Sequence, residues 1–177
     1  RVGISFVNCT FEGEVLGYRN EDKGKMNSNG PLHNADFHKD VLFRDCKFED
    51  EVNFKYTEFR EDADFPGAEF DEEVGFKYTE FNEATDFSGL QTDASIDFKY
   101  TDFDEEVNLA NAKFGGMANF KYTKFPRGAD FSNVTFERDA DFKYAEFPRG
   151  VNMANTTFRD DADFKYTEFR SPANFDG

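Results

Sequence analysis

Large apolar residues recur along this chain at alternating intervals of five and six residues. The clearest segment is Phe54-Lys55-Tyr56-Thr57-Glu58-Phe59, and near copies of it begin at Phe76, Phe98, Phe120, Phe142 and Phe164. The full period is therefore 22 residues. A looser hexad with the same end-to-end spacing begins halfway between these copies, at Phe43, Phe65, Phe87, Leu109, Phe131 and Met153. Self-similarity at a fixed period is typical of a solenoid.

The residues before each large apolar position alternate in a way that predicts short strands. In Ala63-Asp64-Phe65 a small residue stands two positions before the Phe, and a polar residue stands between them. In a strand the small residue and the Phe share one face, and the polar residue points to the other. A helix is excluded, because spacings of five and six place successive Phe on different helical faces.

Two kinds of corner are expected to alternate between these strands. In the looser hexads the corner is Pro66-Gly67 or an equivalent such as Ala110-Asn111, which is the signature of a type II turn with a positive φ at its second residue. In the strict hexads the corner is Lys-Tyr, for which we expect a type I-like turn without a left-handed residue. Four short sides then close each coil.

The periodicity divides the chain into three parts. Residues 1–16 form a first partial coil, residues 17–31 are polar and rich in Gly and Asn and are predicted to be a loop insertion, and residues 32–177 form a continuous stack. One large fault interrupts the stack, at Thr92, where an apolar residue is expected. Leu90 is predicted to fill the space.

Composition supports a core built mainly from one residue type. The chain holds 25 Phe, 7 Tyr and no Trp, although only 38% of its residues are hydrophobic. The predicted core residues include Phe54, Phe59, Phe65, Phe76, Phe98, Phe120, Phe142 and Phe164. No apolar run reaches membrane-span length and no signal-peptide pattern is present, which favours the cytoplasm. Since the chain begins at Arg1 and ends within a repeat, we expect it to be part of a longer protein.

Units such as Ala63-Asp64-Phe65, Ala129-Asp130-Phe131 and Ala162-Asp163-Phe164 resemble the core motif of pentapeptide-repeat proteins. The resemblance implies an all-β fold, a right-handed quadrilateral β-helix, here with roughly seven coils of 22 residues. It covers residues 32–177 well and residues 1–16 weakly. The chain departs from the plain five-residue period by alternating five with six, so every second corner must accommodate one extra residue.

A tyrosine recurs once per coil and is predicted to point outward. These residues are Tyr56, Tyr78, Tyr100, Tyr122, Tyr144 and Tyr166. A basic row precedes them, formed by Lys55, Lys77, Lys99, Lys121, Lys143 and Lys165. A mostly acidic row follows, formed by Glu58, Glu80, Asp102, Glu146 and Glu168 and broken by Lys124. Such a face suits a protein interface. Stacking on sugars and simple shielding of the corner are the alternatives.

The net charge of -16 lies entirely in residues 49–108, which carry twenty acidic and four basic side chains. Nine of these carboxylates occupy predicted bulged corners: Glu49, Asp50, Glu51, Asp71, Glu72, Glu73, Asp104, Glu105 and Glu106. They form a candidate acidic patch that would attract a basic partner and repel nucleic acid. The two alternatives are calcium binding by these carboxylates and a solvated acidic rim. The spacing matches no calcium-loop motif, which favours the solvated rim.

The remaining chemistry is sparse. Cys9 and Cys46 lie 37 residues apart. A 15-residue insertion would stack them in adjacent coils, within disulfide range, whereas a four-residue insertion would place them on opposite walls. We favour the first register and expect free, buried thiols. His33 and His38 fall on different sides, and no catalytic constellation stands apart from the repeats. We therefore expect no metal, no cofactor and no enzymatic activity.

The sequence leads to one functional hypothesis and two alternatives. The first is a β-helical scaffold that binds another protein through the Tyr-Lys face or the acidic middle. Some pentapeptide-repeat proteins imitate DNA and occupy DNA gyrase, and the resemblance implies that alternative. A structural filament built by end-to-end stacking of coils is the third possibility.

Overall fold

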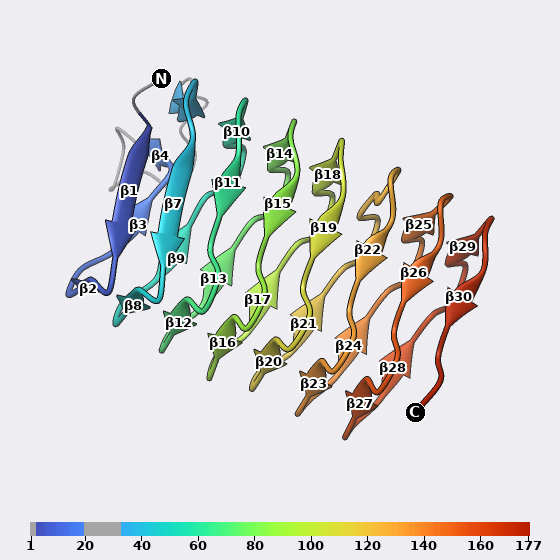
Figure 1. Cartoon of the computed structure of the whole chain (residues 1–177). Coiled ribbons are helices and arrows are strands. Elements are labelled where there is room, and N and C mark those ends of the chain that lie inside the picture. The colour runs from blue at the N-terminus through green and yellow to red at the C-terminus, as the bar shows by residue number, and fades with distance from the viewer. Residues whose placement is uncertain (1–2, 20–32) are drawn as a thin grey trace, which may run out of the picture.

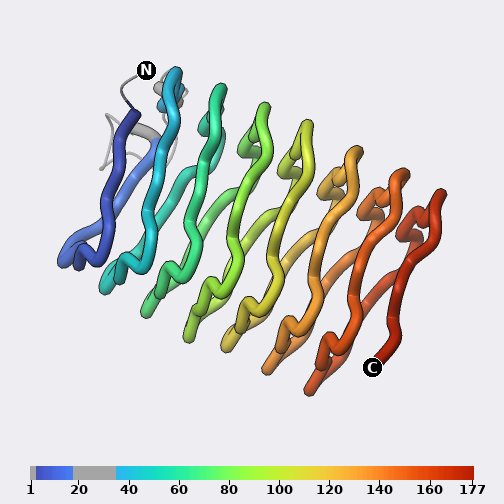
Figure 2. Tube along the Cα trace, viewed as in Figure 1, coloured from blue at the N-terminus to red at the C-terminus, as the bar shows by residue number. Residues whose placement is uncertain are grey.

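The computed structural model describes residues 3–19 and 33–177. These residues form a β-solenoid with four faces, in which paired strands lie 22 residues apart, as in the pairing of Glu58 with Glu80 (Figure 1). The coils follow one another along a single axis (Figure 2). The predicted all-β solenoid is confirmed; the stack makes about six turns.

Faces 1 and 2 follow each other along each coil. Face 1 comprises β1 (Ile4–Val7), β7 (Val41–Arg44), β11 (Ala63–Asp64), β15 (Thr85–Asp86), β19 (Val107–Asn108), β22 (Ala129–Asp130), β26 (Val151–Asn152) and β30 (Ala173–Asn174). These strands form two sheets that divide between β11 and β15, where Phe65 N still donates to Asp86 O at 2.7 Å. Face 2 is one seven-stranded sheet of β2 (Thr10–Phe11), β8 (Lys47–Phe48), β12 (Glu69–Phe70), β16 (Gln91–Thr92), β20 (Lys113–Phe114), β23 (Thr135–Phe136) and β27 (Thr157–Phe158).

Faces 3 and 4 complete the coil. Face 3 is a seven-stranded sheet of β3 (Val15–Leu16), β9 (Val52–Asn53), β13 (Val74–Gly75), β17 (Ile96–Asp97), β21 (Ala118–Asn119), β24 (Ala140–Asp141) and β28 (Ala162–Asp163). Face 4 comprises β6 (Asp36–Phe37), β10 (Glu58–Phe59), β14 (Glu80–Phe81), β18 (Asp102–Phe103), β25 (Glu146–Phe147) and β29 (Glu168–Phe169). Lys124 continues face 4 through single bridges to Asp102 and Glu146.

The insertion replaces the corner between faces 3 and 4 in the first coil. Phe6 pairs with Phe43, an offset of 37 residues, which is the register expected for a 15-residue insertion. Gly17 donates to Asn53 O, as Phe54 donates to Gly75 O one coil later, and Ala35 accepts from Glu58 N. The strands β4 (Tyr18–Arg19) and β5 (His33–Asn34) pair antiparallel between these two points. The predicted loop insertion at 17–31 falls largely on residues 20–32, which lie outside the described residues.

Phenylalanine columns fill the interior. Phe76, Phe98, Phe120 and Phe142 stack with ring centroids 4.9–5.1 Å apart, and edge-on contacts join one column to the next. The predicted core phenylalanines are buried, except that Phe164 in the last coil is half-buried. Stacking neighbours contribute about 0.5–1.5 kcal/mol per pair beyond burial, so each coil is stabilised chiefly by the coils beside it.

Buried threonines add a polar column inside the same interior. Thr101 Oγ1 donates to Phe76 O at 2.6 Å, and Thr123 Oγ1 donates to Phe98 O at 2.7 Å. Each buried hydroxyl therefore has a hydrogen-bond acceptor in the preceding coil, as buried polar groups require. Ala145 occupies the equivalent position in its coil and has no hydroxyl to donate.

The fault at Thr92 is repaired by an exchange of sizes. Thr92 stands in the Phe column of face 2 between Phe70 and Phe114. Leu90 is fully buried at a position that is Ala68 in the preceding coil and Ala112 in the next. Leu90, at a position that is Ala in the neighbouring coils, thus fills the space that Thr92 leaves at a position that is Phe in those coils, as the sequence predicted.

The corner between faces 3 and 4 differs from the prediction. Tyr56, Tyr78 and Tyr100 have φ of 62, 59 and 60°, and the later tyrosines of the series are also left-handed. Thr57 N donates to Phe54 O at 3.0 Å across Lys55 and Tyr56, which is the bond of a type II turn. The expected type I-like turn is wrong, because the four-sided coil needs the same turn at both five-residue steps. The corner between faces 1 and 2, as at Gly67 and Asn111, is left-handed as expected.

Candidate protein-interaction surface

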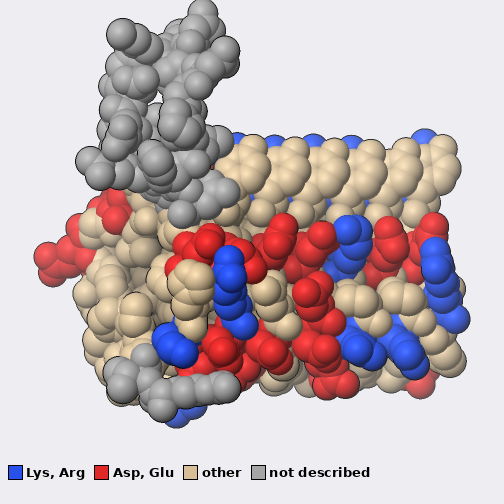
Figure 3. Space-filling view, turned by 90° about the horizontal axis from the view of Figure 1, so that it is seen from above, with Lys and Arg blue, Asp and Glu red and all other residues tan. Residues whose placement is uncertain are grey.

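The six tyrosines form one column on the outside of the corner between faces 3 and 4, which we call the tyrosine column. Consecutive ring centroids lie 4.7–5.0 Å apart, and the four pairs from Tyr56 to Tyr144 are within 8° of parallel. Tyr78, Tyr100 and Tyr144 are 37–39% exposed and Tyr166 is 60% exposed. A band of uncharged side chains runs along the upper edge of Figure 3, with basic side chains behind it.

Side chains at the end of face 3 hold each of these corners in place. Asn53 Oδ1 accepts a hydrogen bond from Lys55 N at 3.1 Å, and Asp97 Oδ1 accepts one from Lys99 N at 2.9 Å. Asn or Asp in this position closes a local turn with the backbone two residues on. Gly75 is the exception, and a Cβ there would lie 3.1 Å from Asn53 Oδ1. The column is thus positioned by strand ends rather than by flexible loops.

Stacking within the column decides which part of each ring a partner can reach. Each internal ring has a tyrosine at 4.7–5.0 Å on both sides, so its two faces are covered. The hydroxyls and ring edges therefore make the outer surface. Sugars bind aromatic residues through ring faces, so the column is poorly suited to carbohydrate stacking, one of the alternatives raised by the sequence.

A lysine line, formed by Lys55, Lys77, Lys99, Lys121, Lys143 and Lys165, follows the column on the side of face 3. In five of the six coils the ammonium lies 4.7–5.4 Å from the ring centroid of the next tyrosine. Lys143 instead pairs with Asp141 and Asp163 at 3.1 and 3.2 Å. Hydrogen bonds to these carboxylates raise the pKa of Lys143. The pKa of Asp163 is lowered, chiefly by the N–H of Lys165 and also by Lys143.

An acidic line, formed by Glu58, Glu80, Asp102, Glu146 and Glu168, follows the column on face 4. Lys124 interrupts it, and its ammonium pairs with Asp102 at 2.9 Å, which raises the pKa of Lys124. A shallow groove of about 390 Å³ separates the column from this line. Its lining is Tyr78, Glu80, Tyr100, Asp102, Tyr122, Lys124, Tyr144 and Glu146. The line is visible in Figure 3 as a mainly red row beside the uncharged band.

The nine carboxylates of the predicted acidic patch do not lie together. Residues 49–51 and 71–73 stack at the corner between faces 2 and 3, whereas residues 104–106 occupy the corner between faces 4 and 1. The alternation of five and six places bulged corners at both, which the linear sequence did not distinguish. At the second corner Arg127 follows one coil later and approaches Glu105 at 3.6 Å. The candidate acidic patch is therefore two separate acidic edges.

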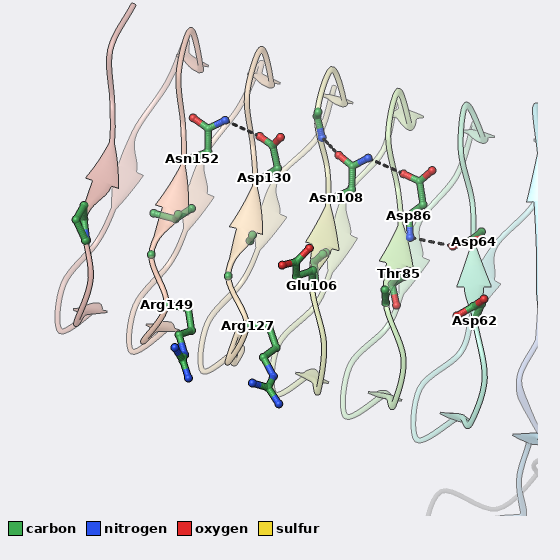
Figure 4. Close-up of a pocket in the computed structure, with 18 residues that line it drawn as sticks. Asp62, Asp64, Thr85, Asp86, Glu106, Asn108, Arg127, Asp130, Arg149 and Asn152 are labelled. Carbon is green, nitrogen blue, oxygen red and sulfur yellow. Dashed lines mark hydrogen bonds between the residues drawn. The ribbon is translucent and has the colours of Figure 1, made fainter.

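Face 1 carries a groove that sequence reasoning missed. Its volume is about 870 Å³, and one wall is a row of Asp and Asn side chains while the other holds Glu106, Arg127 and Arg149 (Figure 4). Asn108 Nδ2 donates to Asp86 Oδ1 at 3.0 Å, which ties neighbouring coils together. The recurrence of Asp or Asn every 22 residues was the available signal.

Asp64 lies on β11, where face 1 divides into its two sheets. Its Oδ1 accepts a hydrogen bond from Asp86 N at 3.1 Å. Burial raises the pKa of the Asp64 carboxyl, and the bond from Asp86 N only partly opposes this shift. The row of polar side chains is thus mainly structural, because the hydrogen bonds drawn in Figure 4 join one coil to the next.

The two cysteines occupy adjacent coils in the expected register and are free. Cys46 is buried and Cys9 is partly exposed. Burial raises the pKa of the Cys46 thiol. Within residues 3–19 and 33–177, no group of three or more His, Cys, Asp or Glu is arranged to hold a metal ion. The same described residues contain no helix long and apolar enough to cross a membrane.

Comparison with known proteins yields one match. A family model for pentapeptide repeats (9 copies) matches residues 32–80, 76–123 and 98–146. The matched region covers the part of the stack in which most of the tyrosine column and of its flanking lines lie. Neither the curated proteins nor the solved structures contain a match.

Proposed function

Because the chain belongs to the pentapeptide-repeat family, we propose that it serves as a non-enzymatic β-solenoid scaffold that docks a protein partner along the tyrosine column. The observation that carries this proposal is the exposure of the column. Away from the two end coils, the exposed large apolar side chains of the described residues are column tyrosines, apart from Met117. A continuous exposed band of this kind commonly marks an interaction surface.

The backbone of the column supports the same proposal. A left-handed conformation costs a residue with a side chain roughly 1–2 kcal/mol, and Gly or Asn bears it more easily. The corner between faces 1 and 2 uses such residues, among them Gly67, Gly89 and Asn111, for the same turn. Tyrosine stacking contributes about 0.5–1.5 kcal/mol per pair, which offsets the cost without clearly exceeding it. The need for a turn therefore does not explain six tyrosines.

The chemistry of the surface favours a protein over other partners. Tyrosine hydroxyls and ring edges lie between a line of ammonium groups and a line of carboxylates, so polar and charged groups of either sign find a counterpart. Tyrosine is enriched at protein interfaces because one end of the side chain is apolar and the other forms hydrogen bonds. The neighbouring carboxylates would repel a nucleic-acid backbone.

Site-specific photo-cross-linking in the cells that produce the protein tests the proposal. A benzophenone amino acid would replace Tyr100, and a matched probe would replace Gln91, which is exposed on face 2. The proposal expects a discrete protein adduct from position 100 and none from position 91. Equal labelling at both positions, or no adduct at position 100 when the protein is folded, would contradict it.

The DNA-mimic alternative receives less support. A mimic of duplex DNA needs negative charge along the rod, whereas residues 49–51 and 71–73 lie on a different edge from residues 104–106, and Arg127 and Arg149 follow the latter. Inhibition of DNA gyrase that weakens with added salt would nevertheless establish it. The filament alternative requires coils of two chains to stack end to end, and concentration-dependent fibres would support it.

A further inference from the structure

We infer that the partner docked by the tyrosine column is a second copy of this chain, lying parallel to the first about a two-fold axis along the rod. This inference rests on the proposed function, because it assigns an occupant to the same surface. It follows from the order of three lines across that surface: the lysine line, the tyrosine column and the acidic line. In-register strand pairing keeps these lines parallel to the axis over successive coils.

Symmetry decides which pairing this order allows. A two-fold axis parallel to the rods reverses the order across the interface, so the lysine line of one copy faces the acidic line of the other, and the two tyrosine columns meet. A two-fold axis across the rods preserves the order and sets lysines against lysines. The interface of a closed dimer is self-complementary only in the first arrangement. The chain therefore selects the parallel dimer.

The coil that contains Tyr78 shows the complementarity most clearly. Within the described part of the chain neither Lys77 nor Glu80 forms an ion pair, so each is available to the other copy. A parallel two-fold axis introduces no shift along the rod, so Lys77 lies opposite Glu80 of the second copy, and the reverse pair forms as well. One coil therefore supplies two opposite-charge contacts.

Lys124, the basic residue that interrupts the acidic line, already forms an ion pair within its own chain. The coil of Tyr122 would set Lys121 opposite Lys124 of the second copy, which is a repulsive pair. The Lys124 ammonium, however, pairs with Asp102 of its own chain at 2.9 Å. The repulsion is thereby reduced. The remaining coils keep opposite charges in register, but Glu58, Asp102 and Glu168 already pair with Arg60, Lys124 and Arg170 of their own chain, so the coil of Tyr78 contributes most to the pairing.

The available area fits a dimer of moderate stability. Six coils at a strand spacing of about 4.8 Å give a strip about 29 Å long. The lower limit of standard specific interfaces is about 1,200 Å² in total, or about 600 Å² from each copy, so a strip of this length would have to make contact over a width of about 20 Å. Interfaces at this lower limit include many weak and transient ones, so dimerisation should be measured at micromolar concentrations and above.

Reciprocal charge reversal in the full chain tests this arrangement by sedimentation velocity. In Lys77→Glu alone, and in Glu80→Lys alone, two attractive contacts become two repulsive ones, and we expect dimerisation to weaken at least tenfold. Mixing the two variants restores both contacts. The introduced glutamate at position 77 then faces the introduced lysine at position 80, and the second contact is the native pair, so a heterodimer should form with near wild-type affinity. The controls Lys113→Glu and Glu69→Lys make the same charge changes on face 2 and should leave dimerisation unchanged.

The outcomes separate this inference from the proposed function. A wild-type chain that stays monomeric to several hundred micromolar, variants that dimerise like wild type, or a mixture that does not recover would each overturn the parallel dimer. If the cross-link from position 100 then joins a different protein, the docking role of the column still holds. Absence of any adduct at that position would overturn both.

Discussion

The exchange of sizes at Leu90 and Thr92 makes a quantitative prediction about packing in this core. Leu90→Ala removes a fully buried side chain and should reduce the free energy of unfolding by about 2–5 kcal/mol. Thr92→Phe inserts a ring beside that leucine and should cost about 1–3 kcal/mol through overpacking. It also removes the hydrogen bond that Thr92 Oγ1 donates to Ala94 O at 2.6 Å.

The double variant Leu90→Ala/Thr92→Phe should behave differently, because it recreates the Ala-and-Phe arrangement of the neighbouring coils. The new ring would stack between Phe70 and Phe114, as Phe48 stacks on Phe70 with centroids 4.7 Å apart. Two such contacts contribute about 1–3 kcal/mol in total. We expect the double variant to lie within about 1 kcal/mol of the wild type, with a coupling energy of about 2 kcal/mol or more.

Urea unfolding followed by far-ultraviolet circular dichroism measures these differences, with constant slopes as the check that the transition itself is unchanged. The reverse exchange, Ala112→Leu/Phe114→Thr, is a matched control in the next coil and should also show strong coupling. Additive losses in the double variant would refute the size exchange, because they would mean that Leu90 and Thr92 do not share one volume.

Three further predictions concern single side chains. Ala145→Thr should add the hydrogen bond found in neighbouring coils and raise the free energy of unfolding by about 0.5–1.5 kcal/mol. Ala145→Val, of similar size, adds no hydroxyl and should give no such increase. Equal effects of the two substitutions would contradict the role of the hydroxyl. Asp64→Asn should stabilise the fold at neutral pH, because the raised folded-state pKa means that the ionised carboxylate costs stability. The advantage should shrink as pH falls through the raised folded-state pKa and should be gone below the ordinary pKa of about 3.9; a gain that persists there in unfolding measurements would refute this cause. Alkylation followed by mass spectrometry should modify Cys9 well before Cys46, whose thiol is buried and has a raised pKa, and faster modification of Cys46 would contradict its burial.

Most of the fold could be predicted from the sequence because each structural feature is repeated. One interval of 22 residues fixes the strand register and the Phe columns, and together with a 15-residue insertion it aligns Cys9 with Cys46. The left-handed tyrosines could not be predicted from residue preference, because Tyr56 and its equivalents adopt a conformation that this residue type disfavours. Closure of the four-sided coil overrides that preference, and only the symmetry of the two five-residue steps indicated it.

The candidate surface was predictable in its members but not in its geometry. The recurrence of Tyr and Lys every 22 residues indicated two parallel lines, yet the covered ring faces depend on centroid distances such as the 4.8 Å between Tyr100 and Tyr122. For the acidic edges, even the members that lie together could not be predicted from the sequence. Glu73 and Glu106 stand in similar local sequences but on different corners, because the six-residue step occurs twice in each coil.

The free energy of unfolding of Tyr100→Asn tests most directly whether the tyrosine column exists for contacts outside its own chain. Asn relieves about 1–2 kcal/mol of left-handed strain, while the lost contacts with Tyr78 and Tyr122 cost about 1–3 kcal/mol. The account therefore predicts a result between a gain of about 1 kcal/mol and a loss of about 2 kcal/mol. A loss of about 3 kcal/mol or more would contradict it, because the coil itself would then require the tyrosine.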